Sequence, residues 1–223
     1  MPQFNSDTLH FLQELSTHNE RDWFSENRSR YEKAVKAPFK AFVDEIIAAC
    51  SVREPVFEGL ESKHCIFRIN RDTRFSKDKR PYKTHVSAGI APGGKKSGDP
   101  GLYLHFDAEK LMIGGGAYWV PKDDLYMLRE HIASQPEQFN SLLEAVEFRR
   151  TYGTLLGERN VRIPKEFQAA AEVCPFILNK QFYYMAEMPA SAILGDDILK
   201  TVMAHFDAAS EVRRFLRTGL QAG

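Results

Sequence analysis

The sequence predicts an α+β fold, in which an antiparallel sheet of about five strands is packed with N-terminal and C-terminal helices. Near both ends of the chain, apolar residues recur at helical spacing, most clearly from Phe39 to Cys50 and from Ile198 to Leu216. Between residues 63 and 119, apolar residues instead alternate with polar ones in short runs that turn residues separate. Strands joined by such short connections pair antiparallel.

Three helices are expected in the N-terminal part, about residues 6–52. Ser6 and Asp7 are suited to cap a short first helix. The second helix spans about 22–36 and starts with an acidic side chain, which favours the positive end of a helix. The third spans 38–50, begins with a proline and follows the i, i+3, i+4, i+7 apolar pattern throughout.

Alternation, together with aromatic and β-branched residues, identifies the strands of the predicted sheet, most of which lie within residues 63–119. The predicted strands are residues 63–69, 82–90, 102–106, 111–119 and 181–187. The segment 92–101 is rich in glycine, lysine, serine and proline and is expected to be a flexible loop.

The C-terminal part, residues 121–223, is predicted to be helical and mixed. Pro121 and Pro136 suit the first turns of two helices. A long final helix is expected over 196–216, capped by one of two adjacent aspartates. Residues 149–180 show no clear periodicity.

Length and charge favour one domain over residues 1–223 and exclude a generally polycationic nucleic-acid binder. The chain has 223 residues, with 30 basic and 30 acidic side chains, so its formal net charge is zero. A chain of this length buries roughly 70–75% of the surface that it exposes when unfolded. It therefore needs neither a disulfide nor a metal to fold.

The cysteines and the apolar runs indicate a cytoplasmic protein. Cys50, Cys65 and Cys174 are odd in number and far apart, which fits reduced thiols better than a disulfide framework. No stretch approaches 18 apolar residues, and the first residues lack the charged and apolar regions of a signal peptide. Neither secretion nor a membrane partner is expected.

One segment stands out by its charge: residues 68–83, here called the basic loop. It contains seven arginines and lysines but only Asp72 and Asp78, a local net charge of +5, so the rest of the chain carries −5. Guanidinium groups bind phosphate and carboxylate oxygens in pairs, and Phe75 and Tyr82 offer stacking surfaces. The segment therefore indicates an anion site.

Two other interpretations of the basic loop stay open at this stage. The arginines could pair with Asp72, Asp78 and more distant acids, in which case the segment is a structural salt-bridge network. Alternatively, the loop could dock nucleic acid or an acidic protein partner. Asp72 lies between two arginines and is expected to be ionised, with a lowered pKa.

The basic loop also carries a family resemblance. Its pattern is Arg-x-x-Arg-Asp-x-Arg-Phe, followed by Asp-Lys and a tyrosine, and consists of Arg68, Arg71, Asp72, Arg74, Phe75, Asp78, Lys79 and Tyr82. In this pattern, and in Trp23-Phe24, Tyr31, Tyr103-Leu104-His105 and Gly114-Gly115-Gly116 with Tyr118 and Pro121, the chain resembles the domain-of-unknown-function 2461 family of bacteria and fungi. The resemblance implies that the loop helps to define the family; it implies no activity.

No metal site or phosphate-binding glycine loop is predicted. His64, His85 and His105 fall on predicted strands and could converge on a metal, but none is spaced as a local ligand pair. His85 is a more plausible general base than ligand, although nearby Lys83 would depress its basicity. The glycines at 114–116 lack the lysine and serine or threonine of a phosphate loop, and instead indicate close packing.

The sequence thus favours a small anionic ligand, bearing phosphate or carboxylate, over nucleic acid. The residues expected to bind it are Arg68, Arg71, Asp72, Arg74, Lys79, Tyr82 and Lys83. Catalytic residues, a cofactor, a reaction and the oligomeric state are not identified by these patterns.

Overall fold

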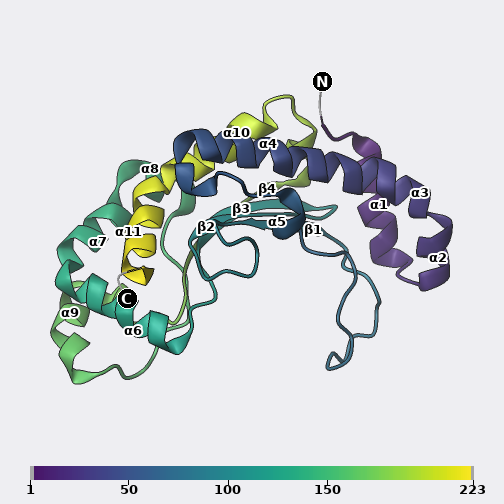
Figure 1. Cartoon of the computed structure of the whole chain (residues 1–223). Coiled ribbons are helices and arrows are strands. Elements are labelled where there is room, and N and C mark those ends of the chain that lie inside the picture. Colours follow the sequence, from purple (N-terminus) through teal and green to yellow (C-terminus); the bar gives the residue numbers. More distant parts are fainter. Residues whose placement is uncertain (1–2, 222–223) are drawn as a thin grey trace. The chain divides into compact units, whose positions relative to one another are not determined.

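The computed structural model describes residues 3–221 and confirms the α+β prediction. Its antiparallel sheet contains β1 (Val86–Ile90), β2 (Gly101–Phe106), β3 (Lys110–Ala117) and β4 (Phe182–Pro189), in that order. All four were predicted to within a few residues and are labelled in Figure 1.

The N-terminal helices are more broken than predicted. They are α1 (Ser6–Thr17), α2 (Arg21–Glu26), α3 (Arg28–Tyr31), the π-helix η1 (Glu32–Lys36), α4 (Ala37–Arg53), the 3₁₀-helix η2 (Pro55–Phe57) and α5 (Ser62–Cys65). The helix expected over 22–36 is divided at Asn27, whose side-chain amide donates to the Trp23 carbonyl at 2.9 Å. That bond satisfies a carbonyl at the end of α2, so the chain can turn there.

The strand predicted over 63–69 was wrong. Its first residues form α5, in which the Ile66 N–H donates to the Ser62 carbonyl at 2.9 Å. Only an isolated antiparallel bridge, between Ile66 and Ala88, continues the sheet pattern. Of the alternating residues, Cys65 and Ile69 are buried, but this stretch pairs with the sheet only at Ile66, so a short apolar alternation does not by itself define a strand.

The C-terminal part contains the predicted helices and several short ones. They are α6 (Lys122–Ser134), α7 (Pro136–Glu144), α8 (Val146–Tyr152), η3 (Lys165–Phe167), α9 (Gln168–Val173), η4 (Pro175–Leu178), η5 (Ala190–Leu194), α10 (Ile198–Ala208) and α11 (Ser210–Leu220). The single final helix expected over 196–216 is two helices, α10 and α11. The break occurs at Ala209, and the Arg213 guanidinium donates across it to the Phe206 carbonyl at 2.9 Å.

The chain divides into two compact units. Unit 1 comprises Met1–Ile90, Tyr103–Ile113 and Glu187–Met203, and unit 2 comprises Ala91–Leu102, Gly114–Ala186 and Ala204–Gly223. The expectation of a single domain therefore stays a prediction. The whole basic loop lies in unit 1.

The core of unit 1 forms where α4 crosses one face of the sheet (Figure 1). Phe39 of α4 meets Phe106 of β2 edge to face, with ring centroids 5.6 Å apart, and Phe4 contacts the same Phe106 ring at 5.3 Å. All three rings are at most 1% exposed. Such aromatic packing dominates core stability, so it fixes the end of the sheet from which the basic loop leaves.

The three glycines of β3 permit close strand packing within unit 2, as the sequence indicated. A Cβ atom on Gly115 would lie 2.1 Å from the Gly101 carbonyl oxygen, and one on Gly116 would lie 2.2 Å from the Phe182 oxygen. Gly116 also has a φ of +99°, a conformation that L-residues rarely adopt. These glycines therefore serve the strand pairing of the sheet.

Within residues 3–221, none of the helices combines the length and the apolar character that crossing a membrane requires.

Candidate functional site

The basic loop is the tip of an irregular ribbon that leaves the sheet next to β1 (Figure 1). At its base, the Arg71 N–H donates to the Pro81 carbonyl at 2.9 Å, and the Lys83 N–H donates to the Ile69 carbonyl at 2.8 Å. Asn70 and Tyr82 form an isolated antiparallel bridge between these bonds. The two ends of the loop are thereby held side by side.

A bulge in the ribbon brings Thr84 and His85 to the site. The bridges at Ile66–Ala88 and Asn70–Tyr82 enclose three residues on the first segment, 67–69, but five on the second, 83–87. The two additional residues cannot pair in a regular ladder, so the second segment bends there. Bulges of this kind redirect side chains and are frequent beside functional sites.

Asn19 fastens the ribbon to the N-terminal helices. Its side-chain amide accepts from the Tyr82 N–H at 3.0 Å and donates to the Tyr82 carbonyl at 3.2 Å and the Leu15 carbonyl at 3.1 Å. Asn19 is only 6% exposed. One buried amide therefore satisfies both backbone groups of the residue that enters the site.

Replacing Asn19 with alanine is expected to lower the free energy of unfolding by about 2–3 kcal/mol, because the part-buried backbone N–H and carbonyl of Tyr82 both lose their partner. Urea denaturation measures this loss. The control is Asn160→Ala, since the one hydrogen bond of Asn160 within residues 3–221 is from its backbone N–H to the Leu178 carbonyl, which the substitution leaves in place. Equal stability of the Asn19 variant and the wild type would show that the tether carries no energy.

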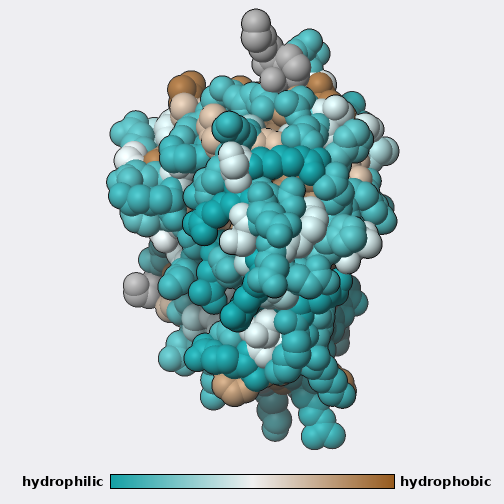
Figure 2. All heavy atoms as spheres, turned by 90° about the vertical axis from the view of Figure 1, so that its right-hand side faces the viewer, coloured by the Kyte–Doolittle hydropathy of each residue, from teal (hydrophilic) through white to brown (hydrophobic). Residues whose placement is uncertain are grey.

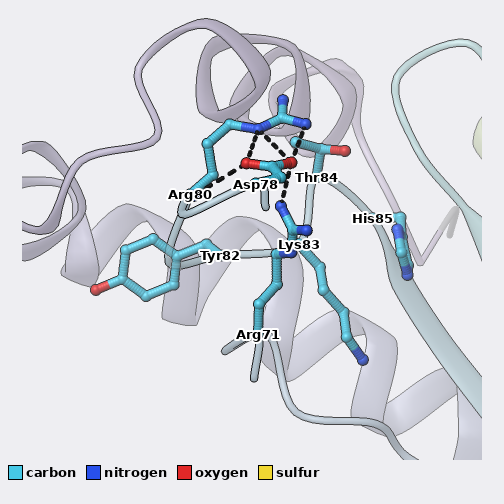
Figure 3. A pocket seen from close by; sticks show the side chains of 7 residues that line it. All are labelled: Arg71, Asp78, Arg80, Tyr82, Lys83, Thr84 and His85. Atoms are coloured by element: carbon cyan, nitrogen blue, oxygen red, sulfur yellow. Dashed lines mark hydrogen bonds and ion pairs between the residues drawn. The ribbon is translucent and has the colours of Figure 1, made fainter. Parts of the chain in front are cut away.

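Tyr82 is held by an aromatic group. Its ring stacks on Phe24 of α2 with centroids 4.0 Å apart and 18° between the planes. Phe24 in turn contacts Tyr31 at 5.1 Å, and burial raises the pKa of the Tyr31 hydroxyl to about 12. The Tyr82 ring points away from the arginines of the loop (Figure 3). Its role in the geometry is therefore to anchor the ribbon.

The two aspartates of the loop are both paired with arginines. Asp78 accepts from Arg71 Nη1 at 2.6 Å, and from the backbone N–H, Nε and Nη2 of Arg80 at 3.0, 3.0 and 2.7 Å. Asp72 accepts from Nε and Nη2 of Arg74 at 3.0 and 2.7 Å. The bonds from Arg74 lower the pKa of Asp72 to about 2, and those from Arg80 and Arg71 hold the pKa of Asp78 lower still. Both carboxylates are ionised at neutral pH.

The basic loop and the bulge line one surface pocket, here called the basic pocket. It has a volume of about 270 Å³, and its lining residues are Arg71, Asp78, Arg80, Tyr82, Lys83, Thr84 and His85 (Figure 3). Three of these side chains are cations and one is a carboxylate, which leaves a balance of +2. Of the two arginines that pair with Asp78, Arg71 is the more enclosed, because its side chain is 25% exposed and that of Arg80 is 54% exposed.

The structure brings together only some of the predicted binding residues. Arg71, Tyr82 and Lys83 line the basic pocket. Outside it, Asp72 and Arg74 pair with each other, Lys79 donates to the Thr73 carbonyl at 2.9 Å, and Arg68 makes no hydrogen bond or ion pair with any of residues 3–221.

Four lining residues were not among the predicted binding residues. Asp78 was part of the family pattern and a possible salt-bridge partner, Arg80 contributed only to the loop's charge, and Thr84 had no signal in the sequence. His85 had been weighed as a base and set aside. The bulge that turns Thr84 and His85 toward the pocket depends on how residues 67–69 pair with 83–87, which no local pattern reveals.

Behind the pocket, two imidazole rings stack. His85 and His105 of β2 have ring centroids 4.1 Å apart and 24° between their planes. His105 Nδ1 lies 3.2 Å from the Tyr103 hydroxyl, and its Nε2 lies 3.8 Å from an Asp107 carboxylate oxygen. His64, which was expected on a strand, lies on the helix α5. Among the described residues, no three histidine, cysteine or acidic side chains are grouped as metal ligands.

A family model described as "Conserved hypothetical protein (DUF2461)" matches residues 7–215. The chain belongs to this family. The matched span contains the DUF2461 motif of the basic loop, the Asn19 tether and both stacked histidines. Neither the curated proteins nor the solved structures that were searched include a match.

Proposed function

We propose that this DUF2461 protein binds a small anionic ligand, bearing a phosphate or carboxylate group, in the basic pocket. The observation that carries the proposal is the charge of the pocket lining, which contains three cations, Arg71, Arg80 and Lys83, and a single carboxylate, Asp78. Cationic side chains gathered around one concave surface concentrate anions there. A ligand with two negative charges would neutralise the remaining +2.

The chemistry of the arginines favours oxyanions in particular. Asp78 already accepts hydrogen bonds from Nε and Nη2 of Arg80 and from Nη1 of Arg71. This pairing keeps the two guanidinium groups next to each other and oriented, at a position where their remaining N–H groups are available to a second oxyanion. Asp78 thus serves as a positioning residue for both arginines.

The size of the pocket limits the ligand to a small group. A volume of about 270 Å³ is slightly below the range of typical ligand pockets, ~300–1,000 Å³. It accommodates a phosphate, a dicarboxylate or the phosphorylated end of a larger molecule. The face of the protein on the side of α1, α2 and α3 is mostly hydrophilic, with a few apolar residues (Figure 2). A polar ligand that extends beyond the pocket would therefore remain in a compatible environment.

The second candidate function is docking of nucleic acid or an acidic partner through the tip of the basic loop. It is favoured by Phe75, which is 94% exposed with the Arg74 guanidinium 5.7 Å from its ring centroid. Two exposed lysines, Lys77 and Lys79, follow Phe75 in the chain. Binding at the tip would replace many counterions and would therefore weaken steeply with salt, whereas binding of a small ligand in the pocket would show a shallower dependence.

Thermal unfolding against a panel of anions distinguishes the two candidates. The panel contains inorganic phosphate, sulfate, pyrophosphate, dicarboxylates, sugar phosphates, nucleotides and short oligonucleotides, each at low and moderate salt. A ligand at a hundred times its dissociation constant adds about 2.7 kcal/mol, which raises Tm by roughly 5–10 °C for a chain of this size. We expect this rise with small oxyanions at both salt concentrations.

The test variant is Lys83→Ala, and its matched control is Lys77→Ala. Each removes one positive charge from the same loop, but only Lys83 lines the pocket. The rise in Tm should be reduced by the first substitution and retained with the second. A rise produced only by oligonucleotides, abolished by salt and reduced equally by both substitutions would favour docking at the tip instead.

We also propose a cytoplasmic location. The support is that Cys50, Cys65 and Cys174 are all buried thiols, none of them in a disulfide. A reducing compartment preserves such thiols.

A further inference from the structure

His85 is the lining residue whose surroundings differ most from those of the arginines. It follows Lys83 by two residues within the bulge, and its ring stacks on His105. The ring nitrogens of His85 make no hydrogen bond to any of residues 3–221. An imidazole in a cationic pocket with both nitrogens unoccupied is suited to contact a ligand directly.

The stacked partner of His85 is held in place. Tyr103 and Asp107 contact opposite nitrogens of the His105 ring. Because His105 is fixed from both sides, the face that it presents to His85 is fixed as well. The His85 ring is thus supported from behind and directed by the bulge, while its polar edge carries no intramolecular bond.

The environment keeps both imidazoles uncharged near neutral pH. Burial, and then the electrostatic effects of the neighbouring His105 and Lys83, lower the pKa of His85 to about 4, with an opposing effect of Asp107. Burial also lowers the pKa of His105, although Asp107 acts in the opposite direction. On the other side of the pocket, Arg71 and Arg80 are shared by an ionised Asp78.

We propose that His85 is the proton-carrying group of the basic pocket: it is neutral in the free protein, takes up a proton when an oxyanion binds, and donates a hydrogen bond to that oxyanion. This inference rests on the proposed function, because it requires that the pocket bind anions. It narrows the ligand class to oxyanions whose oxygens accept a hydrogen bond at the His85 edge of the pocket.

The physical cause is the charge of the ligand. A bound dianion near His85 favours the imidazolium form, and an N–H donated to a ligand oxygen favours it further. Together they oppose the burial and the repulsion from Lys83 that keep the free ring neutral. The protonated ring adds one positive charge to the pocket balance of +2, so that ligand and proton stabilise each other's binding.

The sign of the pH dependence follows from this linkage. Above the pKa of His85 in the complex, the ring is neutral in both states and the affinity does not change with pH. Below that value, the affinity rises as the pH falls, until the pH reaches the pKa of the free protein. If the anion restores the ordinary histidine pKa of ~6.5, affinity should be about tenfold higher at pH ~5.5 than at pH ~8.

The test is calorimetric titration with sulfate, whose charge does not change over this pH range. At pH ~5.5, titrations in buffers of different ionisation enthalpy should show an uptake of close to one proton per sulfate bound. His85→Gln should lose both the proton uptake at pH ~5.5 and the tenfold gain in affinity between pH ~8 and pH ~5.5. The matched control is His64→Gln, an exposed histidine on α5, which should behave as the wild type.

The possible outcomes separate this inference from the proposed function. Sulfate binding with the same affinity at both pH values, or proton uptake that persists in His85→Gln, would overturn the role of His85 and leave the anion pocket standing. Failure of sulfate and phosphate to bind at either pH would overturn both. Thermal unfolding of His85→Gln without ligand shows that the variant is folded before it is titrated.

Discussion

Replacing Arg71 with alanine is expected to lower the affinity of the basic pocket for phosphate or sulfate by about 10–100-fold. Arg71 is the more enclosed of the two arginines that share Asp78, so its N–H groups are the least screened by solvent. A charge-assisted hydrogen bond contributes ~1.5–3 kcal/mol, which corresponds to this loss. Calorimetric titration of the wild type and the variant at one salt concentration measures it.

Two further variants show whether the loss belongs to the pocket or to the charge of the loop in general. Arg74→Ala removes the same charge and the same type of side chain, but Arg74 pairs with Asp72 outside the pocket, and should change affinity less than threefold. Arg71→Lys keeps the positive charge but lacks the planar guanidinium that donates two hydrogen bonds to one oxyanion. This variant should therefore bind more tightly than Arg71→Ala and more weakly than the wild type. Equal losses in the two alanine variants would contradict a localised site.

Replacing Gly116 with alanine is expected to lower the free energy of unfolding by about 3 kcal/mol or more. Its positive φ imposes strain on any L-residue, and the new Cβ would press against the backbone of Phe182 and Tyr183 in β4, which cannot move without breaking the strand pair. Urea denaturation gives the value.

Gly59→Ala is the control for this substitution. Gly59 has a φ of +73°, but no atom lies within 4 Å of the position that a Cβ would take, so alanine there meets strain alone and should cost about 1 kcal/mol. If the two variants were equally stable, the close approach of β3 and β4 at Gly116 would carry no energy, and the triple glycine would need another explanation.

Local patterns predicted most elements of the fold because those elements are long or strongly periodic. The α4 helix has an apolar residue at every core position. Both β2 and β3 contain apolar residues at alternating positions, and turn residues mark the ends of these strands. The segment 63–69 was misassigned because Cys65 and Ile69 are buried at even spacing as in a strand, although the segment begins in the helical turn α5 and pairs with the sheet only at Ile66. The break at Ala209 was missed because the apolar pattern continues through it.

The candidate site was predictable in its charge and not in its geometry. Seven cations among sixteen residues identified the basic loop, but which of them face one pocket depends on ion pairs and on the bulge. Asp72 withdraws Arg74 from the pocket, whereas Asp78 retains Arg71 and Arg80 in it. The stacking of His85 on His105 depends on the pairing of β1 with β2, residues about twenty positions apart in the chain.

The location of a bound oxyanion tests the central proposal most directly. Crystals of the wild-type protein soaked in selenate, a heavy analogue of sulfate, would show the anion by its anomalous scattering. The expected result is a selenate within hydrogen-bond distance of Arg71 and Lys83, with an oxygen facing His85. A selenate bound only at the tip beside Arg74 and Phe75, or none on the basic loop while its residues remain accessible to solvent in the crystal, would contradict an anion site in the basic pocket.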